Sequence, residues 1–149
     1  MNQINKIAIA LITGNLLGNL VLDGDSYKYS HWPQYPKGTT ALSSFIEARG
    51  TTTGIKGTVF NGLQPYIKAY MTVRITHADV DVAKAIVEAH GEPFNEAGWR
   101  RVVDVHGGLI PVRIRAVKEG TFVPVSNVLV TCESTDPELA WIESFIETA

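Results

Sequence analysis

Residues 111–132, PVRIRAVKEGTFVPVSNVLVTC, decide the fold class, because apolar and polar residues alternate at their start with a period of two. Such alternation is typical of strands that have one face on a core and the other toward solvent. Glu119–Gly120 and Ser126–Asn127 are turn sequences, and Pro124 indicates an edge or a bulge, because proline cannot donate to a central ladder. The stretch predicts two or three antiparallel strands.

Three segments before this stretch have the apolar period of helices that are buried on one side. The first covers residues 63–71. The second follows Thr76 and Asp79, which resemble a capping box, and ends before Gly91. The third follows the cap residue Asn95 and ends at a pair of glycines. The expected core-facing residues are Leu63, Tyr66, Ile67, Tyr70 and Met71 in the first, Val80, Ala83, Ile86 and Val87 in the second, and Trp99, Val102, Val103 and His106 in the third.

A fourth helix is predicted after the strands. Residues 135–138, TDPE, combine an N-cap, an early proline and a glutamate three residues after Thr135. The apolar stripe beyond them lies opposite Glu143, Ser144 and Glu147 and consists of Trp141, Ile142, Phe145, Ile146 and Ala149. Burial of each large side chain contributes about 1.5 to 3 kcal/mol, so we expect most of the stripe to pack on this chain's own sheet. The predicted fold class is α+β, with a cluster of helices, an antiparallel sheet and a final amphipathic helix.

Length and composition bound the possible functions. The 149 residues, 45% hydrophobic and 19% charged, suffice for one compact domain. A formal net charge of −2 provides no basic field for nucleic acid or an anionic membrane. The single cysteine, Cys132, cannot form an intramolecular disulfide, and there is no run of 18 apolar residues. We therefore expect a cytoplasmic protein with neither a membrane span nor a secretion signal.

Residues 25–40, DSYKYSHWPQYPKGTT, are rich in aromatic side chains. Residues 23–25 offer an N-cap for a short helix, on which Tyr27 and His31 share a face. Pro33 and Pro36 are expected to end this helix early. Residues 50–57, rich in threonine and glycine, are expected to form a loop or a hairpin turn.

This aromatic segment resembles the opening signature of nicotinamide phosphoribosyltransferases. Further blocks follow in the order of that family: SSFIEAR from Ser43, TVFNGLQ from Thr58, PFNEAGW from Pro93, IPVRIRAVKEG from Ile110, NVLVTCESTDPELAW from Asn127 and a final IETA. The resemblance implies that residues 18–149 form the N-terminal domain of this family, with residues 1–17 as an extension. It also implies a strand within residues 39–49, and that the family's catalytic barrel lies outside this chain.

The resemblance further implies an activity and a set of binding residues. Members of the family are pentosyltransferases, a kind of glycosyltransferase, that make nicotinamide mononucleotide from nicotinamide and phosphoribosyl diphosphate in NAD salvage. In the family, the residue that matches Tyr27 stacks on the pyridine ring from a neighbouring subunit. Asp25 would lie at the nicotinamide end of the pocket, and Arg49 near the phosphate groups. Without the resemblance, the sequence favours a core or rim aromatic for Tyr27, a helix cap for Asp25 and a solvated arginine at a strand end for Arg49.

The sequence offers no catalytic residue and no metal site. The four histidines, His31, His77, His90 and His106, have no ligand spacing, and the phosphate-binding and nucleophile motifs of other enzymes are missing. Arg113 and Arg115 share one face of a strand, where we expect them to be solvated. For a complete enzyme, the resemblance implies Mg²⁺, with ATP as an activator, and either a homodimer or a complementing barrel chain.

Two function classes remain open at this point. The first is the N-terminal part of a nicotinamide phosphoribosyltransferase, inactive alone, which contributes one wall of a pocket across a dimer. In this class the chain is either cut from a longer protein or encoded separately and completed by a second chain. The second is a non-catalytic interaction module that pairs with full-length phosphoribosyltransferase subunits or competes for them.

Overall fold

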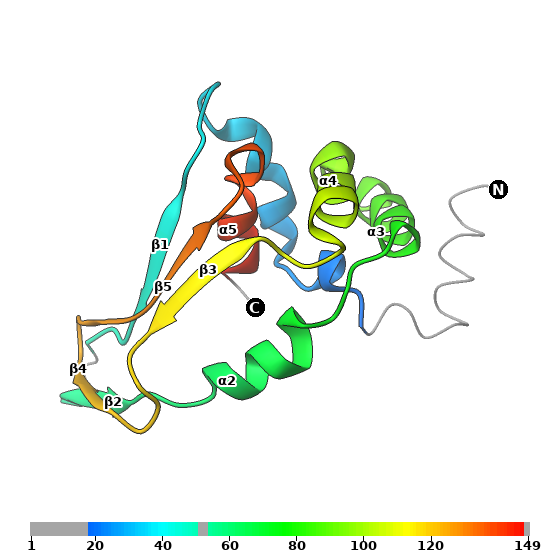
Figure 1. Cartoon of the computed structure of the whole chain (residues 1–149). Coiled ribbons are helices and arrows are strands. Elements are labelled where there is room, and N and C mark those ends of the chain that lie inside the picture. The colour runs from blue at the N-terminus through cyan, green and yellow to red at the C-terminus, as the bar shows by residue number, and fades with distance from the viewer. Residues whose placement is uncertain (1–17, 51–53, 148–149) are drawn as a thin grey trace.

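The computed structural model describes residues 18–50 and 54–147, which form a three-stranded sheet with helices gathered on one side of it (Figure 1). The strands are β1 (Ser43–Glu47), β3 (Val112–Ala116) and β5 (Val128–Ser134), in the order β1-β5-β3. Both pairings are antiparallel. The α+β class, the antiparallel sheet and the strand expected within residues 39–49 are confirmed.

The register of the sheet sorts its side chains onto two faces. Cys132 of β5 lies opposite Ser44 of β1 and Ile114 of β3. These three residues line a groove together with helix residues, so they belong to the helix-facing side. The next pair along, Thr131 with Arg115, faces outward because side chains alternate along a strand. The pairing of β1 with β5 shifts register between Ile46 and Glu47, which marks a β-bulge.

A second, two-stranded sheet extends the end of the first (Figure 1). It pairs β2 (Gly57–Val59) with β4 (Phe122–Pro124), so Pro124 lies in an edge strand, as expected. The turns around β4 contain Gly120 and Ser126, whose φ angles are +85° and +60°. β2 was not expected from the sequence, because three residues are too few to display an alternating pattern. Residues 51–53 of the expected loop lie outside the described residues.

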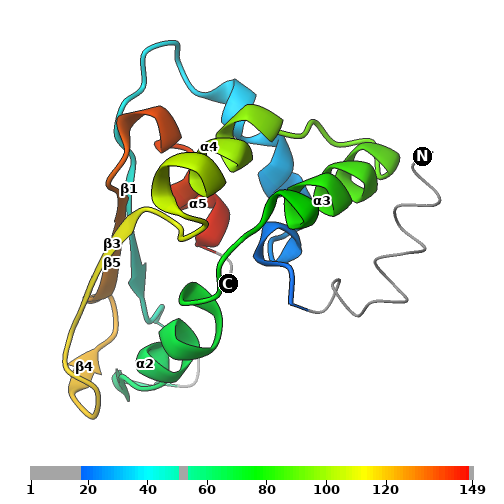
Figure 2. The same cartoon turned by 45° about the vertical axis from the view of Figure 1, so that its right-hand side comes forward.

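The two longest helices lie side by side and form much of the core (Figure 2). α3 (His77–Ala89) begins with the predicted capping box between Thr76 and Asp79. α4 (Glu96–His106) begins where the side chain of Asn95 accepts a hydrogen bond from the backbone of Gly98. Both predictions are confirmed. Most of the expected stripes are buried, whereas Ile86, Val103 and His106 are only half-buried.

The first predicted helix is present but does not pack as expected. It consists of α2 (Leu63–Tyr66) followed by a π-helical turn, η4 (Ile67–Met71). None of its apolar residues is fully buried, and Tyr70 is 45% exposed. The physical reason is its position, since α2 lies below the sheet and apart from α3 and α4 (Figures 1 and 2). The periodicity correctly predicted a helix but wrongly predicted a buried one.

The C-terminal helix differs from its prediction in two respects. Asp136, not Thr135, is the cap, because its side chain accepts a hydrogen bond from the backbone of Glu138. The segment then divides into a 3-10 turn, η5 (Pro137–Leu139), and α5 (Ile142–Ile146). α5 contacts β1 and β5, so its packing on the chain's own sheet is confirmed, and Ile142 and Phe145 are also buried in the helical core. Glu143, however, was expected on the polar side and is only 3% exposed, because α5 contacts both the sheet and the segment near residue 28. Ala149 lies outside the described residues.

The described helices include none that is both long enough and apolar enough to span a membrane.

Candidate functional site

The aromatic segment forms a short 3-10 helix, η2 (Ser26–Ser30), which presents Tyr27 at the surface. The side chain of Tyr27 is 51% exposed, whereas the next two residues, Lys28 and Tyr29, are buried. This alternation follows from the three residues per turn of a 3-10 helix, which directs neighbouring side chains in different directions. The helix therefore has one side on the core and offers an aromatic ring on the other.

Of three sequence predictions about this helix, two are confirmed and one is wrong. The rings of Tyr27 and His31 lie 5.2 Å apart between centroids, so their shared face is confirmed. η2 ends at Ser30, and Pro33 lies in a separate short turn, η3 (Trp32–Gln34), so the early end is confirmed as well. Asp25 occupies the N-cap position, but its side chain makes no capping hydrogen bond. The capping interpretation of the Asp25 carboxylate is therefore wrong.

The buried side of η2 rests on α5. The ring of Tyr29 packs on Phe145 with 5.3 Å between centroids, and its hydroxyl donates to the carbonyl of Val21 at 2.9 Å. Burial of this phenol raises the pKa of Tyr29 to about 12. Gly24, just before η2, fits closely against α5, because a Cβ there would lie 2.8 Å from the ring of Phe145. The position of Tyr27 thus depends on contacts with the C-terminal helix.

Arg49 lies in a different part of the domain. It follows β1 and is exposed. The preceding residue, Ala48, accepts a backbone hydrogen bond from Ser126 at 2.8 Å, which places this point at the end of the sheet near β4. Within the described residues, no hydrogen bond or ion pair joins Arg49 to Tyr27 or Asp25. The structure thus groups Asp25 with Tyr27 on one short helix and puts Arg49 elsewhere.

An apolar groove lies between the helix-facing side of the sheet, α2 and α5. Most of its lining side chains are apolar, and they range from buried Val130 to exposed Phe45 and Ile46. We define the apolar groove by its lining residues: Ser44, Phe45, Ile46, Leu63, Tyr66, Met71, Ile114, Val130, Cys132, Ile146 and Glu147. Such a surface suits contact with another apolar surface better than contact with a charged ligand.

Two ionisable groups lie beside this groove. Burial raises the pKa of Glu143, although the hydroxyl of Ser44 donates a hydrogen bond to its carboxylate. The Oε1 atom of Glu143 is buried and has no hydrogen-bond partner among the described residues. Burial, followed by the nearby charge of Glu143, raises the pKa of Cys132 to about 11. The thiol of Cys132 is therefore protonated at neutral pH and is not an activated nucleophile.

Asp136 forms a second buried polar centre, which the sequence did not reveal. Its Oδ2 accepts from Arg101 Nε and lies beside His106 Nε2, both at 2.7 Å. The hydrogen bond from Arg101 is the largest cause of a pKa that is lowered from 3.8 to about 2. Both partners lie on α4, at least 30 residues earlier in the chain, so no local motif connects them. The cluster fixes α4 to the start of the C-terminal segment.

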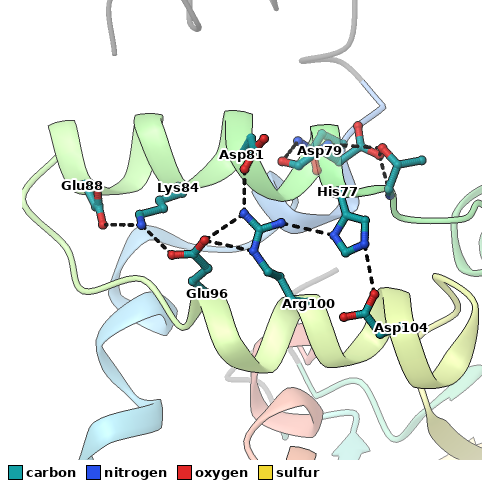
Figure 3. Close-up of polar contacts among 10 residues, drawn as sticks. His77, Asp79, Asp81, Lys84, Glu88, Glu96, Arg100 and Asp104 are labelled. Carbon is teal, nitrogen blue, oxygen red and sulfur yellow. Dashed lines mark hydrogen bonds and ion pairs between the residues drawn. The ribbon is translucent and has the colours of Figure 1, made fainter. Parts of the chain in front are cut away.

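A polar network between α3 and α4 is also a candidate site, but its charges are satisfied internally (Figure 3). Arg100 of α4 donates to Asp81 of α3 at 2.7 Å and to Glu96 at 2.8 Å. The other members of the network are His77, Lys84, Glu88 and Asp104. Paired surface charges of this kind are typical of a scaffold, and each pair contributes little. Across residues 18–50 and 54–147, no three His, Cys, Asp or Glu side chains are grouped so that they could hold a metal ion.

Arg113 and Arg115 both donate to Glu133 at 2.9 Å on the exposed face of the sheet. Their expected position on a solvated strand face is confirmed.

Comparisons with known proteins agree with the motif order. The sequence model of a family described as nicotinamide phosphoribosyltransferase, N-terminal domain, matches residues 19–114. A nicotinamide phosphoribosyltransferase of Xanthomonas campestris pv. campestris (strain 8004) is 54% identical over 132 residues, which cover 89% of this chain and 28% of the relative. A nicotinamide phosphoribosyltransferase of Acinetobacter baylyi (strain ATCC 33305 / BD413 / ADP1) is 26% identical over 138 residues, which cover 83% of this chain and 27% of the relative. The chain thus spans little more than a quarter of the length of these relatives.

Proposed function

The chain belongs to the nicotinamide phosphoribosyltransferase family, and from this we propose that it supplies the nicotinamide-stacking wall of such an enzyme. The reaction joins nicotinamide to phosphoribosyl diphosphate and releases nicotinamide mononucleotide and diphosphate. The observation that carries the proposal is the half-exposed ring of Tyr27 on a helix whose next two residues are buried. We assign residues 18–149 to the N-terminal domain and residues 1–17 to an extension, in a cytoplasmic enzyme.

The chemistry explains why an aromatic face is useful there. The pyridine nitrogen of nicotinamide attacks the anomeric carbon of the ribose as the bond to diphosphate breaks, so positive charge develops on the ring. The negative face of an aromatic side chain attracts such a charge, and aromatic pairs contribute about 0.5 to 1.5 kcal/mol beyond the burial of area. Tyr27 thus binds the pyridinium form of the ring more strongly than the neutral form.

Asp25 and Arg49 have separate roles in this proposal. Asp25 lies two residues before Tyr27, exposed and without a capping bond, so its carboxylate is available to the nicotinamide end of the pocket. Arg49 is exposed at the end of β1, where its guanidinium can donate two parallel hydrogen bonds to phosphate oxygens. Because Arg49 lies apart from η2, we assign it to the phosphate end of the substrates.

We place the rest of the active site outside the described residues. The described residues provide neither a metal-binding group of His, Cys, Asp or Glu nor an activated thiol, so we place Mg²⁺ and the activating ATP outside them. We propose that residues equivalent to the remainder of the relatives supply these sites, in a homodimer or as a complementing barrel chain. The apolar groove suits this contact, because its half-buried lining gains free energy when it is covered.

The test is complementation. This chain is co-expressed with the part of the Xanthomonas campestris relative that its 132 matched residues do not cover, and mononucleotide formation is measured. We expect no activity from this chain alone, activity from the pair, and a loss of tight nicotinamide binding with Tyr27→Ala. The matched control is Tyr70→Ala, which removes another half-exposed tyrosine and should leave the affinity unchanged. An active pair with unchanged nicotinamide affinity in Tyr27→Ala would contradict the stacking role.

The apolar groove also supports a second candidate function, a non-catalytic module that pairs with full-length phosphoribosyltransferase subunits. Mixing this chain with the full-length relative separates the two. Association that lowers the relative's rate favours the module, whereas activity of the complemented pair favours the enzyme.

A further inference from the structure

Lys28 and Glu147 form an ion pair between η2 and α5 directly beside Tyr27. Lys28 Nζ lies 2.8 Å from Glu147 Oε2. The lysine is only 6% exposed, whereas the glutamate is 39% exposed. Lysine is almost never fully buried unless it is paired, so burial at this position indicates that the pair fixes the local structure.

The same ammonium group contacts the candidate stacking residue. Lys28 Nζ lies 5.5 Å from the centroid of the Tyr27 ring, within the range of a cation–π contact. The ring of His31 also lies near Tyr27, with 5.2 Å between ring centroids, and His31 Nδ1 lies 3.4 Å from Ser144 Oγ of α5. Tyr27 is therefore near two side chains that are each bonded to a residue of α5 or to its C-cap, Glu147.

We propose that Lys28 is a positioning residue, which with Glu147 holds Tyr27 in its outward orientation for the pyridine ring. This inference rests on the proposed stacking role of Tyr27 and adds a partner for it on the C-terminal helix. Neither Lys28 nor Glu147 is assigned a contact with substrate. The pair acts by limiting the orientations of η2 and of the Tyr27 ring, so that less conformational freedom is lost when nicotinamide binds.

The pair can be removed without leaving an isolated buried charge. Lys28→Met replaces the lysine with an apolar side chain of similar length, and the partly exposed Glu147 remains solvated. Replacing a buried ion pair by apolar packing is often neutral for stability. We therefore expect the melting temperature to change by no more than about 4 °C. A positioning effect is then separable from a loss of folding.

The first readout uses the full chain alone. The five tyrosines are labelled with 3-fluorotyrosine, and the ¹⁹F resonance of Tyr27 is assigned by its loss in Tyr27→Phe. We expect Lys28→Met to shift or broaden this resonance. Lys84→Met, which removes an ion pair between α3 and α4, is the control and should leave it unchanged. Glu147→Gln changes a partly exposed residue and provides a second variant if Lys28→Met does not fold. An unchanged Tyr27 resonance in the folded variant overturns the proposal.

The second readout uses the complemented enzyme. Lost preorganisation of one side chain predicts that Lys28→Met raises the KM for nicotinamide by about 3- to 10-fold, with a smaller change in kcat. An unchanged KM beside a lowered kcat overturns the positioning role. If Tyr27→Ala leaves nicotinamide binding intact while Lys28→Met still shifts the Tyr27 resonance, the stacking function fails and the structural coupling holds. The two failures are thus distinguishable.

Discussion

The two sides of this domain bury their apolar side chains to different extents. The helical core, formed by α3, α4, α5 and the N-terminal turns, contains fully buried side chains such as Trp99, Val102 and Ile142. The smaller cluster under the sheet consists of Phe60, Val123, Leu129 and Val130, each with some residual exposure, and α2 beside it has no buried residue. The helical side is packed like the interior of a finished protein. The groove side leaves part of its apolar surface uncovered.

The largest expected difference between the two sides is in the cost of truncating an aromatic residue. Trp99 is 1% exposed and makes edge contacts with Trp141 and Phe145 at 5.2 and 5.0 Å between centroids. Trp99→Ala should lower the free energy of unfolding by about 3 to 5 kcal/mol. Tyr66→Ala on α2 should lower it by less than about 1 kcal/mol. Urea unfolding of the full chain, followed by circular dichroism, measures both. Equal losses would contradict the comparison.

The second prediction concerns the polar centre that joins α4 to the C-terminal segment. The pKa of Asp136 is lowered to about 2, so its ionised form stabilises the fold above its ordinary pKa of 3.8, and this stabilisation disappears as pH falls through about 2. Asp136→Asn should therefore lower the free energy of unfolding by about 1 to 2 kcal/mol at pH 7. Near pH 2, the stability of this variant should approach that of the unaltered protein. Urea unfolding at pH 7, 4 and 2.5 tests this.

Glu133→Gln is the control for Asp136, because Glu133 also pairs with two cations, Arg113 and Arg115, but on the exposed sheet face. A much smaller loss is expected there, since solvent screens exposed pairs. If Glu133→Gln lowered the free energy of unfolding as much as Asp136→Asn does, burial would not be what makes the Asp136 pair stabilising.

The sequence predicted most of the fold because local signals determine it. The capping box at Thr76, the cap at Asn95 and the turns at Gly120 and Ser126 act within a few residues, and each has the expected effect. Features that depend on distant partners were not predictable. Asp136 meets α4 residues at least 30 positions earlier, and Lys28 meets Glu147 at a separation of 119.

The errors have the same origin. A period of 3.6 indicates which face of a helix is apolar but not what covers it, so α2 was expected to be buried. A polar residue on the opposite face was expected in solvent, yet Glu143 is covered because α5 has neighbours on two sides. In the candidate site, Asp25 and Tyr27 lie only two residues apart in the sequence, so their proximity could be predicted from the motif. The position of Arg49, by contrast, could be predicted only with knowledge of the direction in which β1 runs.

The third prediction tests the carboxyl group at the boundary of the two sides. Burial raises the pKa of Glu143, so the folded chain binds this proton more tightly than the unfolded chain, and stability falls as pH rises above the ordinary value of 4.5. Glu143→Gln removes the charge and should raise the free energy of unfolding at pH 7 by about 0.5 to 1.5 kcal/mol. Below pH 4 the two proteins should have similar stability. A glutamine variant that is less stable at pH 7 would indicate that the carboxylate is needed in the fold.

Substitutions inside the apolar groove should have the smallest effect on stability. They should instead weaken association with a partner that covers the groove. Ile46 lines the groove and is 47% exposed, so Ile46→Thr, which keeps a β-branched side chain on the strand, should change the free energy of unfolding by no more than about 0.5 kcal/mol. If the remainder of the enzyme covers this surface, the same change should weaken association with the complementing part of the relative by roughly tenfold. Val105→Thr on α4 is the control, because Val105 is 56% exposed but lies outside the groove. Equal affinities for the two variants, measured by titration calorimetry, would mean that the partner binds elsewhere, and the incomplete packing around α2 would then be a property of the isolated domain.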